Sequence, residues 1–409
     1  MAPVTRDLDV VVFGASGFVG RLVAAHLARH APPGTRVGLA GRSPERVRRV
    51  HGDLGPAAAG WPVLTADADD EASLAALARR ARVVVTTVGP YLRHGLPLVR
   101  ACARAGTHYA DLTGEVLFAH RSAEVAHADA VASGARIVHS CGFDSVPSDL
   151  AVLLAARRAR EDGAGPLREA VLHLVSARGG VSGGTVDSLR LQLDTARRDP
   201  AARRLLADPY ALSPDRAAEP DLGPQPDVFR PRPGPERGEW SAPFVMAPYN
   251  TRVVRRSNAL LGHGPRLRYA EDAVFRGPAA PAAAWALTGA LGALTGLLRV
   301  RPLRPALDRL LPAPGSGPDE RTREGGRFRV RLDAVAESGR RYRVVVAAQG
   351  DPGYAATSVM LGQSALALAL DGEALPSAAG VLTPASGIGE RLVERLRDNG
   401  FTLDVEPVG

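Results

Sequence analysis

Three regularly spaced glycines follow the first apolar run of the chain, in the stretch VVFGASGFVG from Val11 to Gly20. A β-rich run over residues 9–13 precedes them, and apolar residues at helical spacing follow. In such a strand, turn and helix, the glycines permit the tight turn, let the backbone approach a pyrophosphate, and let the helix pack closely on the strand. The amides at the helix end would then hold the phosphates. This pattern predicts a dinucleotide site; a turn kept for packing alone is the alternative. The predicted site residues are Gly14, Ala15, Ser16, Gly17, Phe18, Val19 and Gly20.

The end of the second predicted strand, over residues 36–40, indicates which dinucleotide binds. Arg42 and Ser43 stand there, and no acidic residue is present to bind a ribose 2′-hydroxyl. Arg42 is suited to a 2′-phosphate, so we expect NADP(H) rather than NAD(H), with the Ser43 hydroxyl beside it. Ser43 before Pro44 also fits a helix N-cap, which would give it a structural role alone. Asp67, after a third strand, either accepts from the adenine amino group or is an ordinary loop carboxylate.

Polar residues follow the later strands at the same predicted edge of the sheet. The fourth strand, over residues 83–88, stops at Gly89 and Pro90, and we expect Val88, Gly89 and Pro90 to turn under the nicotinamide ribose. Tyr91 and His94 follow at once. Asp144 comes after the strand over residues 136–140, just before a predicted helix. These three side chains are the candidates for moving a proton; Tyr109 and the pair Asn250 and Thr251 are lesser ones.

The composition excludes several classes of chemistry. The chain has no lysine, so all 51 of its Lys and Arg residues are arginine and Schiff-base catalysis is excluded, as is a Tyr-x-x-x-Lys pair. With two cysteines and no Cys/His ligand spacing, we expect neither a disulfide framework nor a metal site, and a reducing compartment fits best. The net charge of +8 is spread along helices without interleaved aromatics, so we expect no nucleic-acid partner.

The order of the predicted elements indicates an α/β fold. Strands alternate with helices as far as residue 140, which predicts a Rossmann-type doubly wound parallel sheet. Further on, a strand over 170–176, a hairpin over 327–348 and an apolar helix over 355–370 predict a second α/β domain of mixed sheet. We expect an NADP-binding domain at 1–148, a second domain at 149–376, and a C-terminal segment at 377–409 that returns to the first domain.

Two segments of the expected second domain stand out. Residues 197–240 are rich in Pro, Asp and Arg, which predicts a long surface loop or lid. Residues 277–298 carry no charge and are followed by the basic run RVRPLR. Two early prolines and many small residues argue against a membrane span, so we favour an apolar segment (277–299) that lies on a membrane surface or lines an acyl tunnel. A buried structural helix is the alternative.

Several motifs make the chain similar to a known family. GASGFVG (14–20), VGPYLRHGLPLVRACARAGTHYADLTGE (88–115) and CGFDSVPSD (141–149) resemble the saccharopine dehydrogenase-like oxidoreductases and, within them, the bacterial trans-acting enoyl reductases. Later blocks match as well: SGGTVDSL, FVMAPYNTRVVRRSNALLG, GDPGYAATSVML and AGVLTPASGIGERLVERL. True saccharopine dehydrogenases use a lysine that this chain lacks, which argues against that activity.

The resemblance implies an NADP-dependent reductase of a C=C bond in a lipid or polyketide intermediate. Such a reduction needs a donor for the enolate oxygen, for which we expect Tyr91, and a proton for the α-carbon, for which we expect His94 or Asp144. A hydroxyl that only holds the turn is the alternative for Tyr91. An NADPH-binding scaffold or redox sensor at a membrane is the alternative for the whole protein.

The resemblance also implies partners and a location. The substrate is expected to be an acyl chain that a carrier could hold, and the protein is expected in the cytoplasm. Contact with the inner face of the plasma membrane through 277–299 and a homodimer are further expectations.

Overall fold

The computed structural model describes residues 6–179, 183–299 and 317–408, which form two compact units. The first unit contains residues 6–146, 317 and 353–399, and the second contains the other described residues.

The first unit is built on a parallel sheet of the order β13-β6-β5-β4-β1-β2-β3. Its central strands carry continuous apolar runs, as expected for strands that are covered on both faces. The β1 residues Val10 to Val12 and the β4 residues Val83 to Val85 are fully buried. The predicted doubly wound sheet is therefore confirmed. Its strands are β1 (Leu8–Phe13), β2 (Val37–Gly41), β3 (Val63–Thr65), β4 (Ala81–Thr86), β5 (His108–Ala110), β6 (Arg136–Val138) and β13 (Gly380–Leu382).

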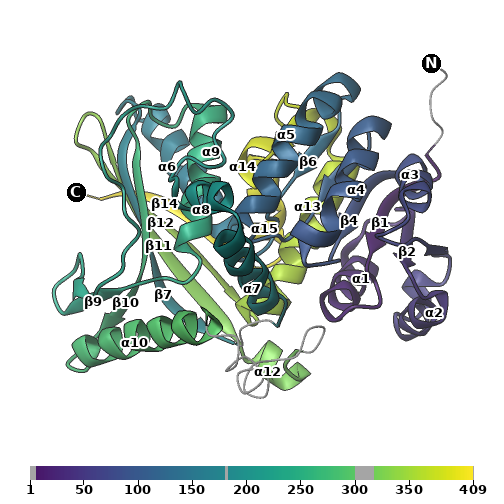
Figure 1. The fold of residues 1–409 in the computed structure, drawn as a ribbon, viewed down its shortest axis with the longest axis horizontal. Helices are drawn as coiled ribbons and strands as arrows, with labels where there is room; N and C mark the ends of the chain where they lie inside the picture. The colour runs from purple at the N-terminus through teal and green to yellow at the C-terminus, as the bar shows by residue number, and fades with distance from the viewer. Residues whose placement is uncertain (1–5, 180–182, 300–316, 409) are drawn as a thin grey trace. The chain divides into compact units, whose positions relative to one another are not determined.

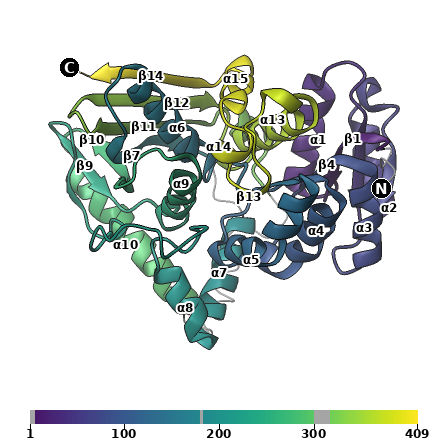
Figure 2. The same ribbon diagram turned by 90° about the horizontal axis from the view of Figure 1, so that it is seen from above.

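Helices cover both faces of this sheet, as Figure 2 shows. One layer contains α1 and α13, which pack on each other, and the other contains α3, α4 and α5. The helices of the unit are α1 (Phe18–His30), α2 (Pro44–Asp53), α3 (Glu71–Arg80), α4 (Tyr91–Ala105), α5 (Val116–Ser133), α13 (Thr357–Leu370), α14 (Pro384–Gly387) and α15 (Glu390–Asp398). Short helical turns lie at η1 (Pro56–Ala58), η3 (Pro352–Ala356), where the two units meet in the sequence, and η4 (Gly372–Ala374).

The C-terminal third of the chain differs from the expected domain boundaries. Residues 353–399 belong to the first unit, although we expected the second domain to run to residue 376. The helix α13 fills the sheet face beside α1, where a Cβ on Gly362 would stand 2.6 Å from the His26 ring. Of the expected C-terminal segment, residues 377–399 lie in the first unit, whereas the last strand, β14 (Thr402–Val408), pairs with β12 of the second unit.

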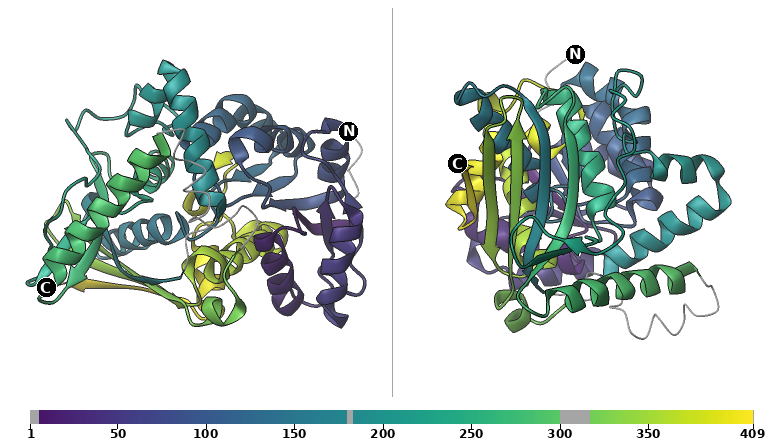
Figure 3. Two further views of the ribbon diagram at one scale, coloured as in Figure 1. Left: turned by 60° about the horizontal axis from the view of Figure 1, so that its bottom comes forward. Right: turned by 90° about the vertical axis from the view of Figure 1, so that its left-hand side faces the viewer.

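The second unit contains a mixed sheet of the order β14-β12-β11-β7-β10-β9-β8, whose strands lie side by side in Figure 3. β7 and β10 are parallel and the other neighbours are antiparallel. The strands are β7 (Leu167–Arg178), β8 (Arg232–Pro233), β9 (Glu239–Ala242), β10 (Arg268–Arg276), β11 (Arg327–Ala336), β12 (Arg341–Gln349) and β14. The helices are α6 (Val146–Glu161), α7 (Gly183–Arg198), α8 (Pro200–Ala207), α9 (Ala247–Leu261), α10 (Ala280–Arg299) and α12 (Glu320–Glu324).

The segment 197–240 is an anchored connection. It contains α8 and the short strands β8 and β9, and residues 208–231 between them have no regular secondary structure. Three buried arginines of α9 donate to its backbone carbonyls: Arg252 to Leu206 at 3.2 Å, Arg255 to Pro209 at 3.2 Å and Arg256 to Leu212 at 2.6 Å. These bonds fix a stretch that lacks apolar periodicity.

The uncharged segment forms α10, which packs on β9 and β10 along the lower edge of Figure 1. Two stretches of the described chain are long and apolar enough to cross a membrane, Ala280–Leu298 and Pro352–Leu370. The second is 78% buried and is a core element of the first unit, whereas the first is only 11% buried. The alternative of a buried structural helix at 277–299 is therefore wrong.

Candidate functional site

The glycine turn after β1 has the geometry of a phosphate cradle. Gly14 has a φ of +88°, which favours glycine. A Cβ on Gly20 would stand 2.1 Å from the Gly14 carbonyl oxygen, so only glycine lets α1 start this close to the turn. Gly17 is the exposed N-cap residue of α1 and has no side chain that could cap the helix, so the positive helix end suits an anion.

The other cradle residues support this turn. Ala15 is buried, while Ser16 and Val19 are half-buried beside the open helix end. The Phe18 ring packs edge-on against Tyr354, with 4.9 Å between ring centroids. The segment around Tyr354 thus supports the first turn of α1 from behind.

The residues after β2 match the expected 2′-phosphate site in part. Arg42 is exposed, and its guanidinium has no acidic partner among the described residues. The Ser43 hydroxyl accepts from the Arg46 backbone N–H at 3.4 Å and donates to Glu45 at 3.0 Å. Ser43 is therefore the N-cap of α2, as the alternative for this residue had it. The Asp67 carboxylate accepts from the backbone N–H of Asp69 at 3.1 Å, which leaves its other oxygen available.

The turn after β4 places Tyr91 inside the fold. The Gly89–Pro90 peptide is cis, and the Val88 backbone N–H donates to the Thr86 hydroxyl at 3.2 Å. The Tyr91 hydroxyl donates to the Thr86 carbonyl at 3.1 Å, and its side chain is buried against the Phe118 ring. Burial raises the pKa of Tyr91 well above its usual value. This is the geometry of a hydroxyl that holds the turn.

His94 points toward the adenine side of the sheet. Its Nδ1 lies 3.3 Å from the carboxylate of Asp69, which is in the loop after β3. In a sheet of this order the end of β3 lies on the adenine side and the ends of β5 and β6 on the nicotinamide side. His94 therefore lies beside the loop after β3.

Asp144 lies in the loop between β6 and α6. The side chain is half-buried, and no hydrogen bond to its carboxylate is found in the described part of the chain. Burial raises its pKa to about 6. A carboxyl group in this state can hold a proton near neutral pH and release it.

Two buried carboxylates order the edge between β5 and β6. Asp111 accepts from the Tyr109 hydroxyl at 2.9 Å and lies 2.7 Å from His139, whose other nitrogen lies 2.7 Å from the Ser122 hydroxyl. This Asp, His and Ser arrangement is almost fully buried, so no substrate reaches it. Glu115, the second carboxylate, binds the start of α4. The sequence assigned these two acids no role, because their partners lie on other elements.

The lesser candidates of the second unit lie in its core. Asn250 on α9 donates to Glu271 at 2.9 Å, and Tyr269 donates to the same carboxylate at 2.7 Å. Burial raises the pKa of Glu271 to about 7 in spite of these donors. The Thr251 hydroxyl accepts from Arg252 at 3.0 Å, so it supports the α9 anchors.

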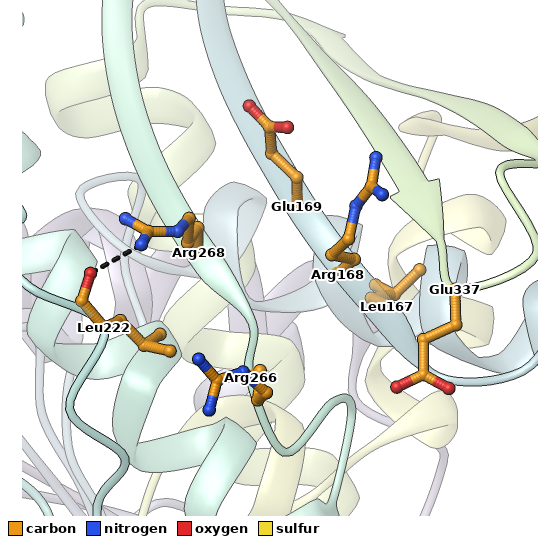
Figure 4. A pocket seen from close by; sticks show the side chains of 7 residues that line it. All are labelled: Leu167, Arg168, Glu169, Leu222, Arg266, Arg268 and Glu337. Carbon is orange, nitrogen blue, oxygen red and sulfur yellow. Dashed lines mark hydrogen bonds between the residues drawn. The ribbon is translucent and has the colours of Figure 1, made fainter.

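A surface cavity of about 400 Å³ lies at one end of the second sheet, at the start of β7 and β10 (Figure 4). Its lining contains none of the predicted site residues. One of its arginines is already bonded, since Arg268 donates to the Leu222 carbonyl at 2.5 Å. The lining residues are Leu167, Arg168, Glu169, Leu222, Arg266, Arg268 and Glu337.

Comparisons with known proteins define the class. Residues 10–138 match the saccharopine dehydrogenase NADP binding domain, in agreement with the glycine cradle and the free Arg42. The fold is similar to that of apo saccharopine dehydrogenase (L-Glu forming) from Saccharomyces cerevisiae, with a TM-score of 0.57 and 15% identity over 98% of this chain and 99% of that one. The protein is an NADP(H)-dependent oxidoreductase with a Rossmann-type first unit.

Full-length relatives define the family. The chain is 48% identical to the trans-acting enoyl reductase of Mycobacterium bovis and 48% identical to that of Mycobacterium ulcerans, over 98% of this chain and 99% of each relative. A Mycobacterium tuberculosis protein is 51% identical over 98% of both chains. The chain belongs to the trans-acting enoyl reductase family.

Proposed function

We propose that the protein uses NADPH to reduce the carbon–carbon double bond of an enoyl group in a lipid or polyketide intermediate. The observation that carries the proposal is a full-length relationship to trans-acting enoyl reductases combined with an intact NADP cradle. An enoyl substrate suits a lysine-free chain, since this reduction needs a hydride, a proton and support for an enolate oxygen, but no imine.

The cofactor would be held by the residues that the geometry favours. The amides at the start of α1 would bind the pyrophosphate, Arg42 the 2′-phosphate and Asp67 the adenine amino group. The turn Val88 to Pro90 would lie under the nicotinamide ribose. When bound, NADPH supplies the hydride for the β-carbon.

Asp144 is the proton source in this proposal. Its carboxyl lies at the nicotinamide side of the sheet, has no competing hydrogen bond within the described residues, and has a pKa of about 6. Protonated, it would transfer its proton to the substrate α-carbon and recover one from water. Tyr91 and His94 are assigned other tasks, because the first binds Thr86 and the second faces Asp69.

The experiment is isotope transfer. The protein is incubated with NADPH deuterated at C4, with each face labelled in a separate run, together with enoyl thioesters and a lipid extract. We expect deuterium at a β-carbon of one substrate class. Saturable NADPH binding without transfer to any acceptor would support a cofactor-binding scaffold instead.

The pH profile tests Asp144. A proton donor with a pKa of about 6 is protonated below that pH, so the hydride-transfer rate should fall as the pH rises through 6. Asp144→Asn should remove this limb and lower the rate about 100-fold or more, with NADPH affinity unchanged. A wild-type profile that Asp144→Asn leaves in place would exclude the role.

We further propose that α10 rests on an anionic membrane surface at the cytoplasmic face, where a lipid substrate would be reached. Exposed apolar residues recur along it every three or four positions, at Ala282, Trp285, Ala286, Gly289, Ala293 and Leu297. This gives the helix one continuous uncharged face, and Trp285 is 58% exposed. The sequence continues with Arg299, Arg301 and Arg304, which complement anionic headgroups.

Vesicle binding tests this contact. Trp285→Glu and Leu297→Glu should abolish co-sedimentation with phosphatidylglycerol vesicles, and wild type should bind phosphatidylcholine vesicles less well. Phe229→Glu is the matched control, because Phe229 is also exposed but lies outside α10. Unchanged sedimentation of the α10 variants would contradict the proposal.

A further inference from the structure

The carboxylate of Glu115 binds the N-terminus of α4, a helix from another part of the sequence. Its two oxygens accept from the backbone N–H groups of Tyr91 at 2.9 Å and Leu92 at 2.7 Å. Glu115 is fully buried, and Pro90, the N-cap of α4, makes no capping hydrogen bond through its side chain. The helix start is thus held by a residue of the loop between β5 and α5.

The position of this carboxylate is itself fixed. The Glu115 backbone N–H donates to the Thr113 hydroxyl at 3.1 Å, and the Thr113 N–H donates to Asp111 at 3.1 Å. Asp111 is bound by Tyr109 and His139, so the chain of bonds ends in the core between β5 and β6. The turn between β4 and α4 is therefore held by hydrogen bonds that lead to β5 and β6 as well as by its connection to β4.

The same contact sets the electrostatics of the sheet edge. The N-terminus of a helix carries about half a positive charge, which attracts phosphate. Glu115 occupies that end of α4 with a negative charge, whereas the N-cap residue of α1 is Gly17, which has no capping side chain. The start of α1 therefore attracts a pyrophosphate more strongly than the start of α4 does.

We propose that Glu115 is a positioning residue for the nicotinamide half of NADP(H). By holding the amides of Tyr91 and Leu92, it keeps the turn Val88 to Pro90 at the height where the nicotinamide ribose rests. The proposal depends on the NADP(H) cofactor and is independent of the enoyl substrate, so either can fail alone.

A comparison of whole cofactor with a fragment tests the proposal. Adenosine 2′,5′-bisphosphate contains the adenine half of NADPH and lacks the nicotinamide. Glu115→Gln retains one acceptor but sets an NH₂ group against the second backbone N–H. We expect the Kd of NADPH, measured by calorimetry, to rise about tenfold, which corresponds to the loss of one charge-assisted hydrogen bond. The Kd of the fragment should change less than about twofold.

The control is a destabilising change at the opposite end of the same strand. The Thr107 hydroxyl donates to the Ala78 carbonyl at 2.6 Å, just before β5, so Thr107→Val should lower Tm without changing the ratio of the two Kd values. Thr113→Val, which removes the support of Glu115, should shift the ratio in the same direction by a smaller factor. Equal weakening of both ligands by Glu115→Gln, or no change in either, would overturn the proposal.

Discussion

Replacement of Arg42 by alanine should reduce the preference of this protein for NADPH over NADH. Arg42 is exposed beyond β2 and has no ion-pair partner in the described chain, so its guanidinium is free to bind a phosphate. A charge-assisted hydrogen bond contributes about 1.5–3 kcal/mol, and an exposed ion pair at most about 1 kcal/mol. For a guanidinium at the protein surface we take about 2 kcal/mol, which corresponds to a Kd about 30-fold higher for NADPH.

The assay is a titration of Arg42→Ala with NADPH and with NADH, followed by nicotinamide fluorescence. NADH lacks the 2′-phosphate, so its Kd should change less than about twofold, and high salt should reduce the NADPH effect. Arg46→Ala is the matched control, because Arg46 is also exposed on α2 but bonds to Ser43 only through its backbone. Equal losses for both cofactors, or the same loss in Arg46→Ala, would refute the assignment of Arg42 to the 2′-phosphate.

Three further variants test the site and its support. Tyr91→Phe should lower the free energy of unfolding by about 1–2 kcal/mol, because the hydrogen bond to Thr86 is lost, and should leave turnover within about threefold. A loss of turnover above about 100-fold would instead support Tyr91 as the donor to the enolate oxygen. Gly20→Ala should abolish NADPH binding and lower Tm, because its Cβ would stand 2.1 Å from the Gly14 oxygen; normal binding would contradict the cradle. Glu271, with a pKa raised to about 7, favours folding most at low pH and loses that contribution as the pH rises through 7. Glu271→Gln should therefore flatten the fall of Tm between about pH 5 and 7, and an unchanged slope in scanning fluorimetry would count against this.

The sequence predicted the features that depend on local geometry. The parallel sheet follows from apolar strands that alternate with helices, and the phosphate cradle follows from Gly14, Gly17 and Gly20, since each glycine meets a steric demand within a few residues. The free guanidinium of Arg42 follows from the absence of an acid in the same turn.

Features that depend on residues far apart in the chain could not be predicted from the sequence. His94 contacts Asp69, which lies 25 residues earlier in the chain, and this contact has no sequence signature. The capping of α4 by Glu115 spans 24 residues, so local capping rules did not find it. The place of residues 353–376 in the first unit was missed for the same reason, because the sequence of an apolar helix such as α13 does not say which core it packs into.

The helices α10 and α13 show that the sequence alone does not tell whether a glycine in an apolar helix is required by packing. The stretches Ala280–Leu298 and Pro352–Leu370, which contain most of α10 and all of α13, are both long and apolar enough to cross a membrane, and both contain glycine. In α13, a Cβ on Gly362 would clash with His26, so that glycine is required by packing. In α10, a Cβ on Gly289, Gly292 or Gly296 would meet no atom of the described residues within 4 Å. These glycines therefore make no contact in the described fold that an added methyl group would disturb. Replacing all three by alanine should consequently preserve folding and vesicle binding, whereas Gly362→Ala should destabilise the first unit.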